Sequence, residues 1–242
     1  MRIETFHLKF LPVNQLSLLT VILILLIAGC NSNPGPGGDA TKVSFNTEDG
    51  IQLSGHLFGS GDVGIVLSHM RHADQESWWS FARVLKNKGY QIIAYDFRGY
   101  RDSLGEIDIG NIDKDVQAAV DFLKSKGVSK LFLIGAHMGG TASLKVASKE
   151  DIAGVVTLSA PPIIDVLDIG EDIRLISSPK LFMASRDDVF YSRSVDLFDQ
   201  KASAPKERWI VDGNAHGTNM LSGDSGPRVQ GLIVDFLRRY SE

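Results

Sequence analysis

Cysteine is nearly absent from this sequence, and basic residues are not in excess. Cys30 is the only cysteine among the 242 residues, so no disulfide can form within the chain. The net charge at pH 7 is −4, which excludes the strongly cationic surface typical of nucleic-acid-binding proteins. Hydrophobic residues make up 43% and charged residues 22%, as in an ordinary globular protein, and the length favours one domain or at most two.

An apolar run long enough to cross a membrane comfortably is also missing. The run at residues 16–27 falls short of the ~20 residues that a spanning helix needs. Arg2 and Lys9 precede it and small residues follow it, an order typical of a secretory signal. Residues 27–30 (IAGC) resemble the lipobox of bacterial lipoproteins, which implies cleavage before Cys30 and a diacylglycerol on its sulfur. An uncleaved anchor with an incidental Cys30 is the alternative.

We therefore expect three parts in the chain. Residues 1–29 are predicted to be a lipoprotein-type signal peptide, residues 30–41 a flexible Pro/Gly-rich tether, and residues 42–242 one folded domain. The protein is then expected to be exported and held on a bacterial membrane through lipidated Cys30, on the periplasmic or cell-surface side.

Strand and helix patterns alternate from residue 64 onward, which predicts a mainly parallel α/β sheet with helices on both faces. Before that point, residues 42–47 and 51–58 alternate in polarity around a turn, which predicts an antiparallel hairpin at a sheet edge. Between Pro162 and Pro179 there is room for one short helix only, so little or no lid is expected. The other strands are expected at 64–67, 92–95, 131–134, 152–158, 180–184 and 208–211, and the helices at 78–88, 113–126, 141–148 and 228–240.

A glycine-framed turn follows the predicted strand at residues 131–134. Its sequence, GAHMG at residues 135–139, has the layout of a nucleophile elbow, G-x-S-x-G, in which a strained strand-to-helix turn presents a side chain above the sheet. Glycines are needed there because other side chains would clash with the neighbouring strand and helix. His137 stands where the nucleophilic serine is expected, so the turn indicates the fold but leaves the chemistry open.

Five segments together carry a resemblance to a known family. They are LSHM (67–70), DFRGY (96–100), GAHMGG (135–140), RDD (186–188) and GNAHG (213–217). With these segments in this order and at predicted strand ends, the chain from Lys42 onward resembles the α/β-hydrolase superfamily, close to its small esterase and dienelactone-hydrolase-like members. The resemblance implies an α/β-hydrolase fold and an ester-like substrate or other small-molecule ligand, with no cofactor.

The resemblance also implies catalytic roles. Such hydrolases order their triad as nucleophile, acid and histidine. His137 then stands at the nucleophile position, and His216 at the base. Asp188 matches the acid, with Asp187 as its rival. A carboxylate on one imidazole nitrogen fixes the tautomer and supports the protonated form.

An oxyanion hole is expected beside the elbow. By resemblance, the backbone N–H of Met138 faces that of Arg71, or of Met70 next to it, and such donors stabilise developing negative charge. Three aromatic side chains could line an apolar cleft, although core packing is the default expectation for at least one tryptophan: Trp78, Trp79 and Tyr100.

His137 leaves three interpretations of this site open. In the first, the hydrolase site is degenerate and binds a small molecule or a protein partner. In the second, ester or acyl substrates are hydrolysed by His137 as nucleophile, or by water that the Asp188–His216 pair activates. In the third, His137 and His216 join His69 or His72, with Asp188, around a metal ion. We favour the first and expect no metal. The serines not expected to replace the missing hydroxyl are Ser68, Ser143 and Ser159.

Overall fold

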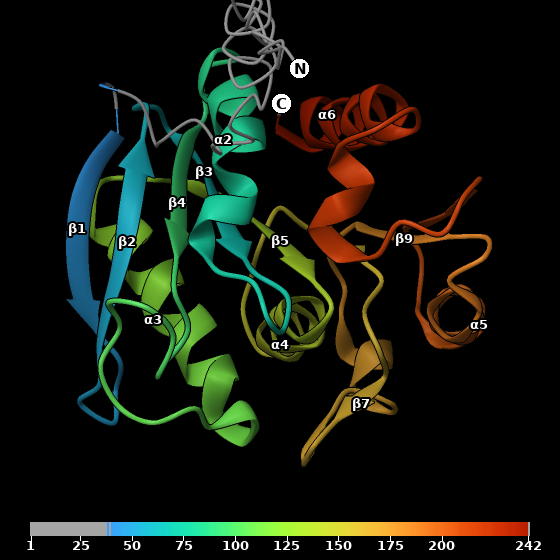
Figure 1. The fold of residues 1–242 in the computed structure, drawn as a ribbon, viewed down its shortest axis with the longest axis horizontal. Coiled ribbons are helices and arrows are strands. Elements are labelled where there is room, and N and C mark those ends of the chain that lie inside the picture. The colour runs from blue at the N-terminus through green and yellow to red at the C-terminus, as the bar shows by residue number, and fades with distance from the viewer. Residues whose placement is uncertain (1–37, 39, 242) are drawn as a thin grey trace, which may run out of the picture. The chain divides into compact units, whose positions relative to one another are not determined.

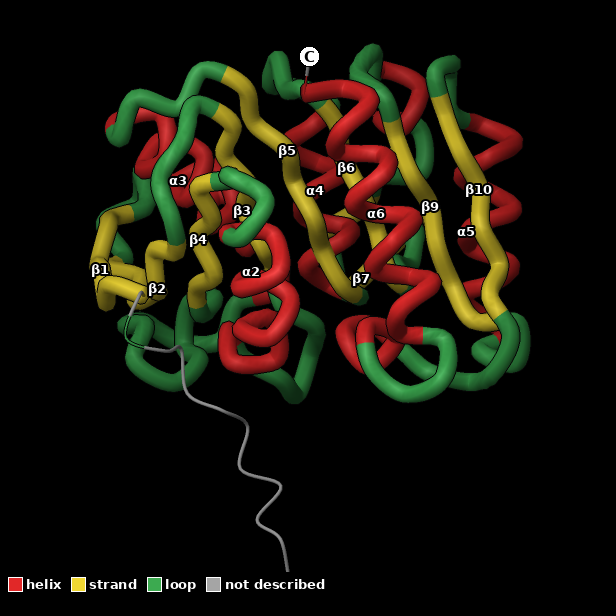
Figure 2. The backbone as a smooth tube through the Cα atoms, turned by 90° about the horizontal axis from the view of Figure 1, so that it is seen from above, coloured by secondary structure: helices red, strands yellow, loops and turns green. Residues whose placement is uncertain are grey.

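The computed structural model describes Gly38 and residues 40–241, so the predicted signal peptide and Cys30 lie outside the described residues. Its main element is an eight-stranded sheet (Figures 1 and 2). In sheet order the strands are β1 (Ala40–Asn46), β2 (Gln52–Phe58), β4 (Gln91–Tyr95), β3 (Val63–Ser68), β5 (Lys130–Ala136), β6 (Gly154–Leu158), β9 (Lys180–Ser185) and β10 (Lys206–Val211).

The pairing matches the predicted sheet. β1 and β2 form an antiparallel hairpin at one edge, and β2 pairs antiparallel with β4. All the other neighbours, from β4 through β3 to β10, pair in parallel. The carboxyl ends of six parallel strands therefore meet at one edge of the sheet, where ligand sites of α/β proteins lie.

Helices cover both faces of the sheet (Figure 2). α2 (Trp79–Lys86) and α6 (Gly226–Ser241) cover one face, and α3 (Ile112–Ser125), α4 (Met138–Ala147) and α5 (Val189–Lys201) cover the other. Strand side chains alternate between the two cores: in β5, Phe132 packs in the α2–α6 core and Leu133 in the other. Within residues 40–241, none of the helices combines the length and the apolar character needed to cross a membrane.

Two segments differ from the sequence-based expectation. The sequence pattern does not predict α5, which lies between β9 and β10. The short helix predicted between Pro162 and Pro179 is the 3₁₀ helix η3 (Asp172–Leu175), but the sequence pattern does not predict the hairpin of β7 (Ile163–Ile164) and β8 (Leu167–Asp168) that precedes it.

A buried arginine ties the loop after β4 to α3 and to the β1–β2 turn. The Arg98 side chain is 5% exposed, and its Nε donates to Asp115 Oδ1 at 2.8 Å. Its Nη1 donates to Asp49 Oδ2 at 2.9 Å. Burial raises the pKa of Asp115 to about 6 in spite of these bonds, whereas the bond from Arg98 holds the pKa of Asp49 well below its usual range.

A buried lysine holds the chain ahead of β10. Lys180 is fully buried, and its Nζ donates to the carbonyl oxygens of Ser203 at 2.9 Å and Pro205 at 3.3 Å. Burial lowers the pKa of Lys180 to about 8, because the ammonium has exchanged water for these two acceptors.

Candidate active site

The turn after β5 has the geometry of an elbow. His137 has φ 49° and ψ −118°, a conformation that is strained for any residue with a side chain. A Cβ on Gly135 would lie 2.2 Å from the carbonyl oxygen of Gly139, and a Cβ on Gly140 would lie 2.7 Å from the Cβ of Ala160. Only glycine fits at these close approaches, and they hold residue 137 at the carboxyl edge of the sheet.

The His137 imidazole is partly buried and uncharged at neutral pH. Its ring packs edge-on against Tyr191 and His216, with centroids 5.5 Å and 5.2 Å away. Burial, and then electrostatic repulsion from His216 and Arg71, lowers the pKa of His137 to about 4. Among the described residues no hydrogen-bond partner reaches its Nδ1. The elbow therefore presents a neutral imidazole with an unpaired ring nitrogen.

Asp188 and His216 meet at the same edge. Asp188 lies between β9 and α5, and His216 follows β10. Nδ1 of His216 donates to Oδ2 of Asp188 at 2.8 Å, and the two side chains are 31% and 16% exposed. In the neutral ring this bond leaves Nε2 as an acceptor, the tautomer that a general base needs. Asp187 is exposed, and the structure pairs Asp188 with the imidazole in its place.

The serines near the site are engaged elsewhere or buried. Ser159 donates from its hydroxyl to Oδ2 of Asp188 at 3.1 Å. Ser68 pairs with a buried tyrosine hydroxyl at 3.0 Å, and the Ser143 hydroxyl is buried in α4 without a partner among the described residues. Within residues 40–241 none of the three is hydrogen-bonded to His216.

The loop after β3 lies against the start of α4. A Cβ on Gly139 would be 2.4 Å from the carbonyl oxygen of Ser68, so the two segments touch through their backbones. Within the described part of the chain, the N–H groups of Met138 and Arg71 donate no hydrogen bond. The first amides of a helix have no partner inside it. Both predicted oxyanion donors are thus free, and Met70 lies beside Arg71 on the same loop.

His69 and His72 do not join the two imidazoles of the site. His69 is fully buried, with Nδ1 bonded to the Met70 carbonyl at 2.8 Å and Nε2 accepting from the Phe97 N–H at 3.1 Å. His72 is exposed in the same loop. Across the described residues, no three His, Cys, Asp or Glu side chains gather in a way that could hold a metal ion.

Polar side chains also lie around the elbow. Nη2 of Arg71 pairs with Oδ2 of Asp165 on the β7–β8 hairpin at 3.1 Å. The Tyr191 ring lies 4.4 Å from the His216 ring, and Tyr100 lies on the loop after β4. Burial raises the pKa of both tyrosines, so both hydroxyls are protonated and can donate to a ligand.

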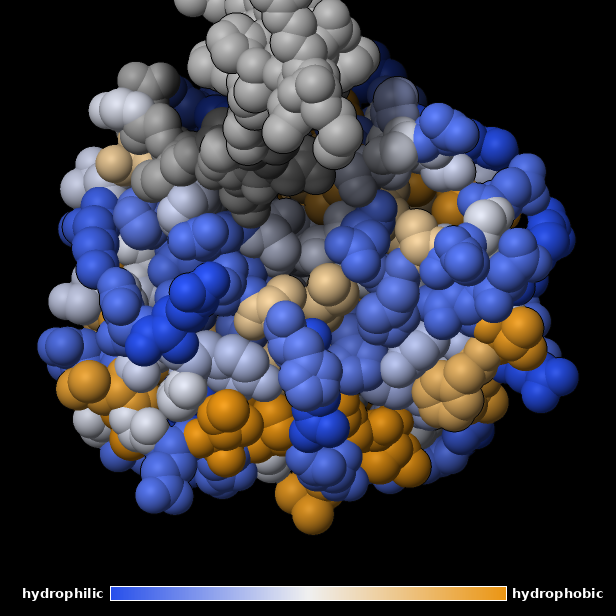
Figure 3. Space-filling model, viewed as in Figure 1, coloured by the Kyte–Doolittle hydropathy of each residue, from blue (hydrophilic) through white to orange (hydrophobic). Residues whose placement is uncertain are grey.

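Exposed apolar side chains extend along this edge. In the described residues, the large apolar side chains that are more than half exposed lie in segments after β4, β6 and β9: Leu104, Ile107, Ile163, Val166, Leu175, Val189 and Phe190. Figure 3 shows apolar surface along the lower edge of the molecule, where Figure 1 places the β7–β8 hairpin. Trp78 and Trp79 are 0% and 7% exposed in the core beside α2, so the core packing expected for at least one of them holds for both, and neither lines a cleft.

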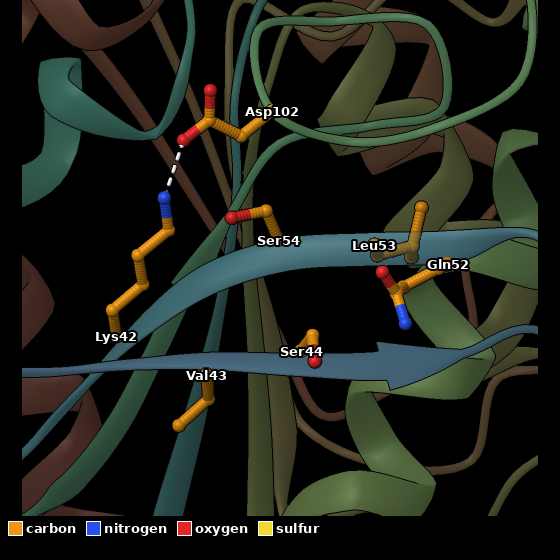
Figure 4. A pocket seen from close by; sticks show the side chains of 7 residues that line it. All are labelled: Lys42, Val43, Ser44, Gln52, Leu53, Ser54 and Asp102. Atoms are coloured by element: carbon orange, nitrogen blue, oxygen red, sulfur yellow. Dashed lines mark hydrogen bonds and ion pairs between the residues drawn. The ribbon is translucent and has the colours of Figure 1, made fainter.

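A separate hollow of about 360 Å³ lies on the β1–β2 hairpin (Figure 4). Lys42 and Asp102 pair beside it at 2.6 Å. Its lining residues are Lys42, Val43, Ser44, Gln52, Leu53, Ser54 and Asp102. None of them belongs to the elbow, to the loop after β3, or to the loops that carry Asp188 and His216, so this hollow is not part of the candidate site.

Two side chains enter the site without a sequence signal. Tyr191 comes from α5, the helix that the sequence pattern does not predict. Ser159 has a role only through contacts with distant loops, which no local pattern reveals. The sequence predicts a role for the Arg71 backbone N–H only, whereas its guanidinium also forms an ion pair with Asp165 on the β7–β8 hairpin.

Comparison with known proteins identifies the fold. Residues 65–175 match the family model described as alpha/beta hydrolase fold. The chain is 26% identical over 168 residues to the alpha/beta hydrolase domain-containing protein aho-3 of Caenorhabditis elegans, which covers 60% of this chain and 50% of that protein. It is 29% identical over 107 residues to a carboxylesterase of Bacillus subtilis, covering 43% and 44%. The chain thus spans about half the length of these two relatives.

Solved structures agree. An esterase of Pyrococcus furiosus superposes with a TM-score of 0.75 at 19% identity, over 84% of this chain and 93% of that one. Together with the sheet order and the elbow, this confirms the α/β-hydrolase fold predicted from the sequence.

Proposed function

Because this chain has the α/β-hydrolase fold and carries an imidazole at its elbow, we propose that it binds a small acyl compound without hydrolysing it through a serine. The observation that carries the proposal is His137: the position that presents a hydroxyl in serine esterases presents a neutral imidazole here. The site is then a degenerate esterase-like site that serves mainly as a binder.

The chemistry of the elbow supports this proposal. Serine hydrolysis needs a hydroxyl that His216 can deprotonate, and none of the serines considered is hydrogen-bonded to that imidazole within the described residues. An acyl group on His137 would be a labile acyl-imidazole in place of a stable ester. In a subtilisin-like protease, loss of the serine lowers turnover by about 10⁶, and what remains comes from binding and the oxyanion hole.

The surroundings of the elbow suit an acyl ligand. The free N–H groups of Arg71 and Met138 can donate to a carbonyl or carboxylate oxygen. The Arg71 guanidinium, which pairs with Asp165, and Tyr191, whose ring packs against His137, add polar groups near the elbow. Apolar side chains along the same edge, such as Phe190, can cover a hydrocarbon portion. A ligand with an oxygen-bearing head and an apolar tail fits both features.

A second function, hydrolysis without a serine, is favoured by the intact acid–base pair. Asp188 holds His216 at 2.8 Å with Nε2 available to accept a proton from water. In this alternative, water activated by the pair attacks the ester, or His137 itself is the nucleophile.

Replacing His137 separates these functions. We expect the purified full chain in detergent to remain unlabelled by a serine-directed fluorophosphonate and to leave p-nitrophenyl butyrate intact. His137→Ser should gain labelling at position 137 and hydrolyse the ester at least ~10³-fold faster than wild type. His137→Ala is the matched control, since it removes the imidazole without adding a hydroxyl.

The opposite results are equally informative. Labelling of wild type on any serine would contradict the proposal. Hydrolysis by wild type that His216→Gln abolishes would establish the water or histidine mechanism. Of these two, only the histidine mechanism would also be lost in His137→Ala.

We also propose that the chain is exported and lipid-anchored through Cys30. The support is the order of basic, apolar and small residues ahead of this single cysteine. Metabolic incorporation of an alkyne-tagged fatty acid by wild type, and its loss in Cys30→Ser, is the expected result. Equal incorporation by both proteins would contradict it.

A further inference from the structure

Ser159 lies at the end of β6 and touches both loops that carry the acid and the base. It is fully buried, and its backbone N–H donates to the Met183 carbonyl in β9 at 2.8 Å. Its hydroxyl donates to Oδ2 of Asp188 at 3.1 Å and accepts from the N–H of Gly217 at 3.2 Å. The Met220 sulfur is 3.5 Å away, but a carboxylate is the stronger acceptor for the single hydroxyl proton.

The backbone of Ser159 is strained. Its φ is 51°, in the left-handed region that glycine adopts readily and that residues with a side chain disfavour. The hydroxyl of Ser159 makes two buried hydrogen bonds, which offset the cost of this backbone conformation. We therefore attribute the presence of serine, where glycine would be unstrained, to the hydrogen bonds of its side chain.

We propose that Ser159 is a positioning residue for the Asp188–His216 pair. Oδ2 of Asp188 receives both the Ser159 hydroxyl and Nδ1–H of His216, so Ser159 fixes the carboxylate rotamer that faces the imidazole. Its hydrogen bond from the N–H of Gly217, the residue next to His216, also fixes the loop that carries His216. One hydroxyl thereby couples two loops that reach the site from different strands. The effect of Ser159 on turnover rests on the acid–base role proposed above, whereas its effect on the tautomer of His216 does not.

Without this hydroxyl, two changes follow. The Asp188 carboxylate is free to rotate away from His216, and the buried N–H of Gly217 loses its acceptor. The imidazole then exchanges between its two neutral tautomers, because nothing holds Nδ1 as the donor. This change is specific to the pair and need not alter the fold.

The test is a nitrogen-15 NMR measurement of the His216 ring in the full chain in detergent micelles. Wild type should show one neutral tautomer with Nδ1 protonated. In Ser159→Gly and Ser159→Ala, the tautomers should mix, and exchange of the Nδ1 proton with water should rise about tenfold or more, the scale for losing a hydrogen bond to a charged group. Thr157→Val is the matched control, since Thr157 is a buried β6 residue whose hydroxyl has no partner among the described residues.

The glycine and alanine variants differ in a further way. Ser159→Gly relieves the backbone strain and should melt at or above the temperature of Ser159→Ala, although both lose the pair geometry. If Ser159→Gly does not fold, the NMR comparison is made with Ser159→Ala. An unchanged tautomer and exchange rate in the Ser159 variants, or an equal change in Thr157→Val, would overturn the proposal.

Activity supplies an independent readout. In a His137→Ser background, Ser159→Gly should lower kcat about tenfold and leave KM within about twofold, because the pair acts on the chemical step. If His137→Ser alone gives no turnover, the acid–base role proposed for the Asp188–His216 pair fails, while the NMR result still decides the role of Ser159.

Discussion

The neutral imidazole at the elbow predicts how stability depends on pH. Folding lowers the pKa of His137 from 6.5 to about 4, chiefly through burial. The folded state therefore binds this proton more weakly than the unfolded chain does. The stability that His137 contributes is complete above pH 6.5, and it is lost as the pH falls from 6.5 through 4.

The size of the effect follows from these two pKa values. Between pH 7.5 and pH 5.0, a shift from 6.5 to about 4 corresponds to a loss of about 2 kcal/mol, at 1.36 kcal/mol per pKa unit. Part of the His137 ring contacts solvent, which reduces the expected value to about 1.5 kcal/mol. In His137→Ser this titration is gone. Wild type should therefore lose about 1.5 kcal/mol more than the variant over this pH range.

The measurement is urea-induced unfolding of the full chain at both pH values, followed by the fluorescence of the buried Trp78 and Trp79. The comparison of wild type with His137→Ser cancels the other titrating groups, such as Asp115, that both proteins share. His72→Ser, which removes an exposed histidine from the nearby loop, controls for the loss of a histidine as such. Equal pH dependence in wild type and His137→Ser would refute the inference that the elbow imidazole is buried and neutral.

Three further substitutions probe the frame around the site. Arg98→Met should cost about 3–5 kcal/mol in urea unfolding, because it leaves the buried Asp115 without its cation; a loss below about 1 kcal/mol would contradict this. Gly135→Ala should lower the free energy of unfolding by about 2 kcal/mol or more, since its Cβ would lie 2.2 Å from the carbonyl oxygen of Gly139 in α4. The control Gly231→Ala, on the open surface of α6, should leave that free energy unchanged or raise it. The depressed pKa of Lys180 predicts stability that rises from pH 8 to 10.5 in wild type and is flatter in Lys180→Met, as melting temperatures at pH 7.5 and 10 would measure; parallel curves would argue against it.

The elbow and the sheet could be predicted because local chemistry dictates them. Gly135 and Gly140 are sites where no side chain fits, and such glycines mark the turn in the sequence itself. The β5 residues are apolar on both faces because each face meets its own core. Asp188 follows β9 and His216 follows β10, and these two strands are neighbours in the sheet. The predicted acid and base therefore meet at the carboxyl edge, as their places in the chain indicate.

Other features depend on contacts that no window of sequence contains. Helix α5 begins with exposed Val189 and Phe190, so its apolar residues do not form one clean stripe and the helical period is obscured. Trp78 and Trp79 are adjacent and yet both buried, because the chain changes there from a 3₁₀ turn to a helix against the sheet. Ser159 acts through partners 29 and 58 residues away, which gives a lone serine no recognisable pattern.

The elbow has a consequence for protein engineering. Its backbone conformation is set by the glycines packed around it, and the Nδ1 of His137 bonds to nothing within the described residues. The side chain at this position is therefore exchangeable without rebuilding the turn. Serine, cysteine and aspartate installed in turn would each be presented to the same imidazole and the same amides, so one backbone would report how the choice of attacking atom alone changes reactivity.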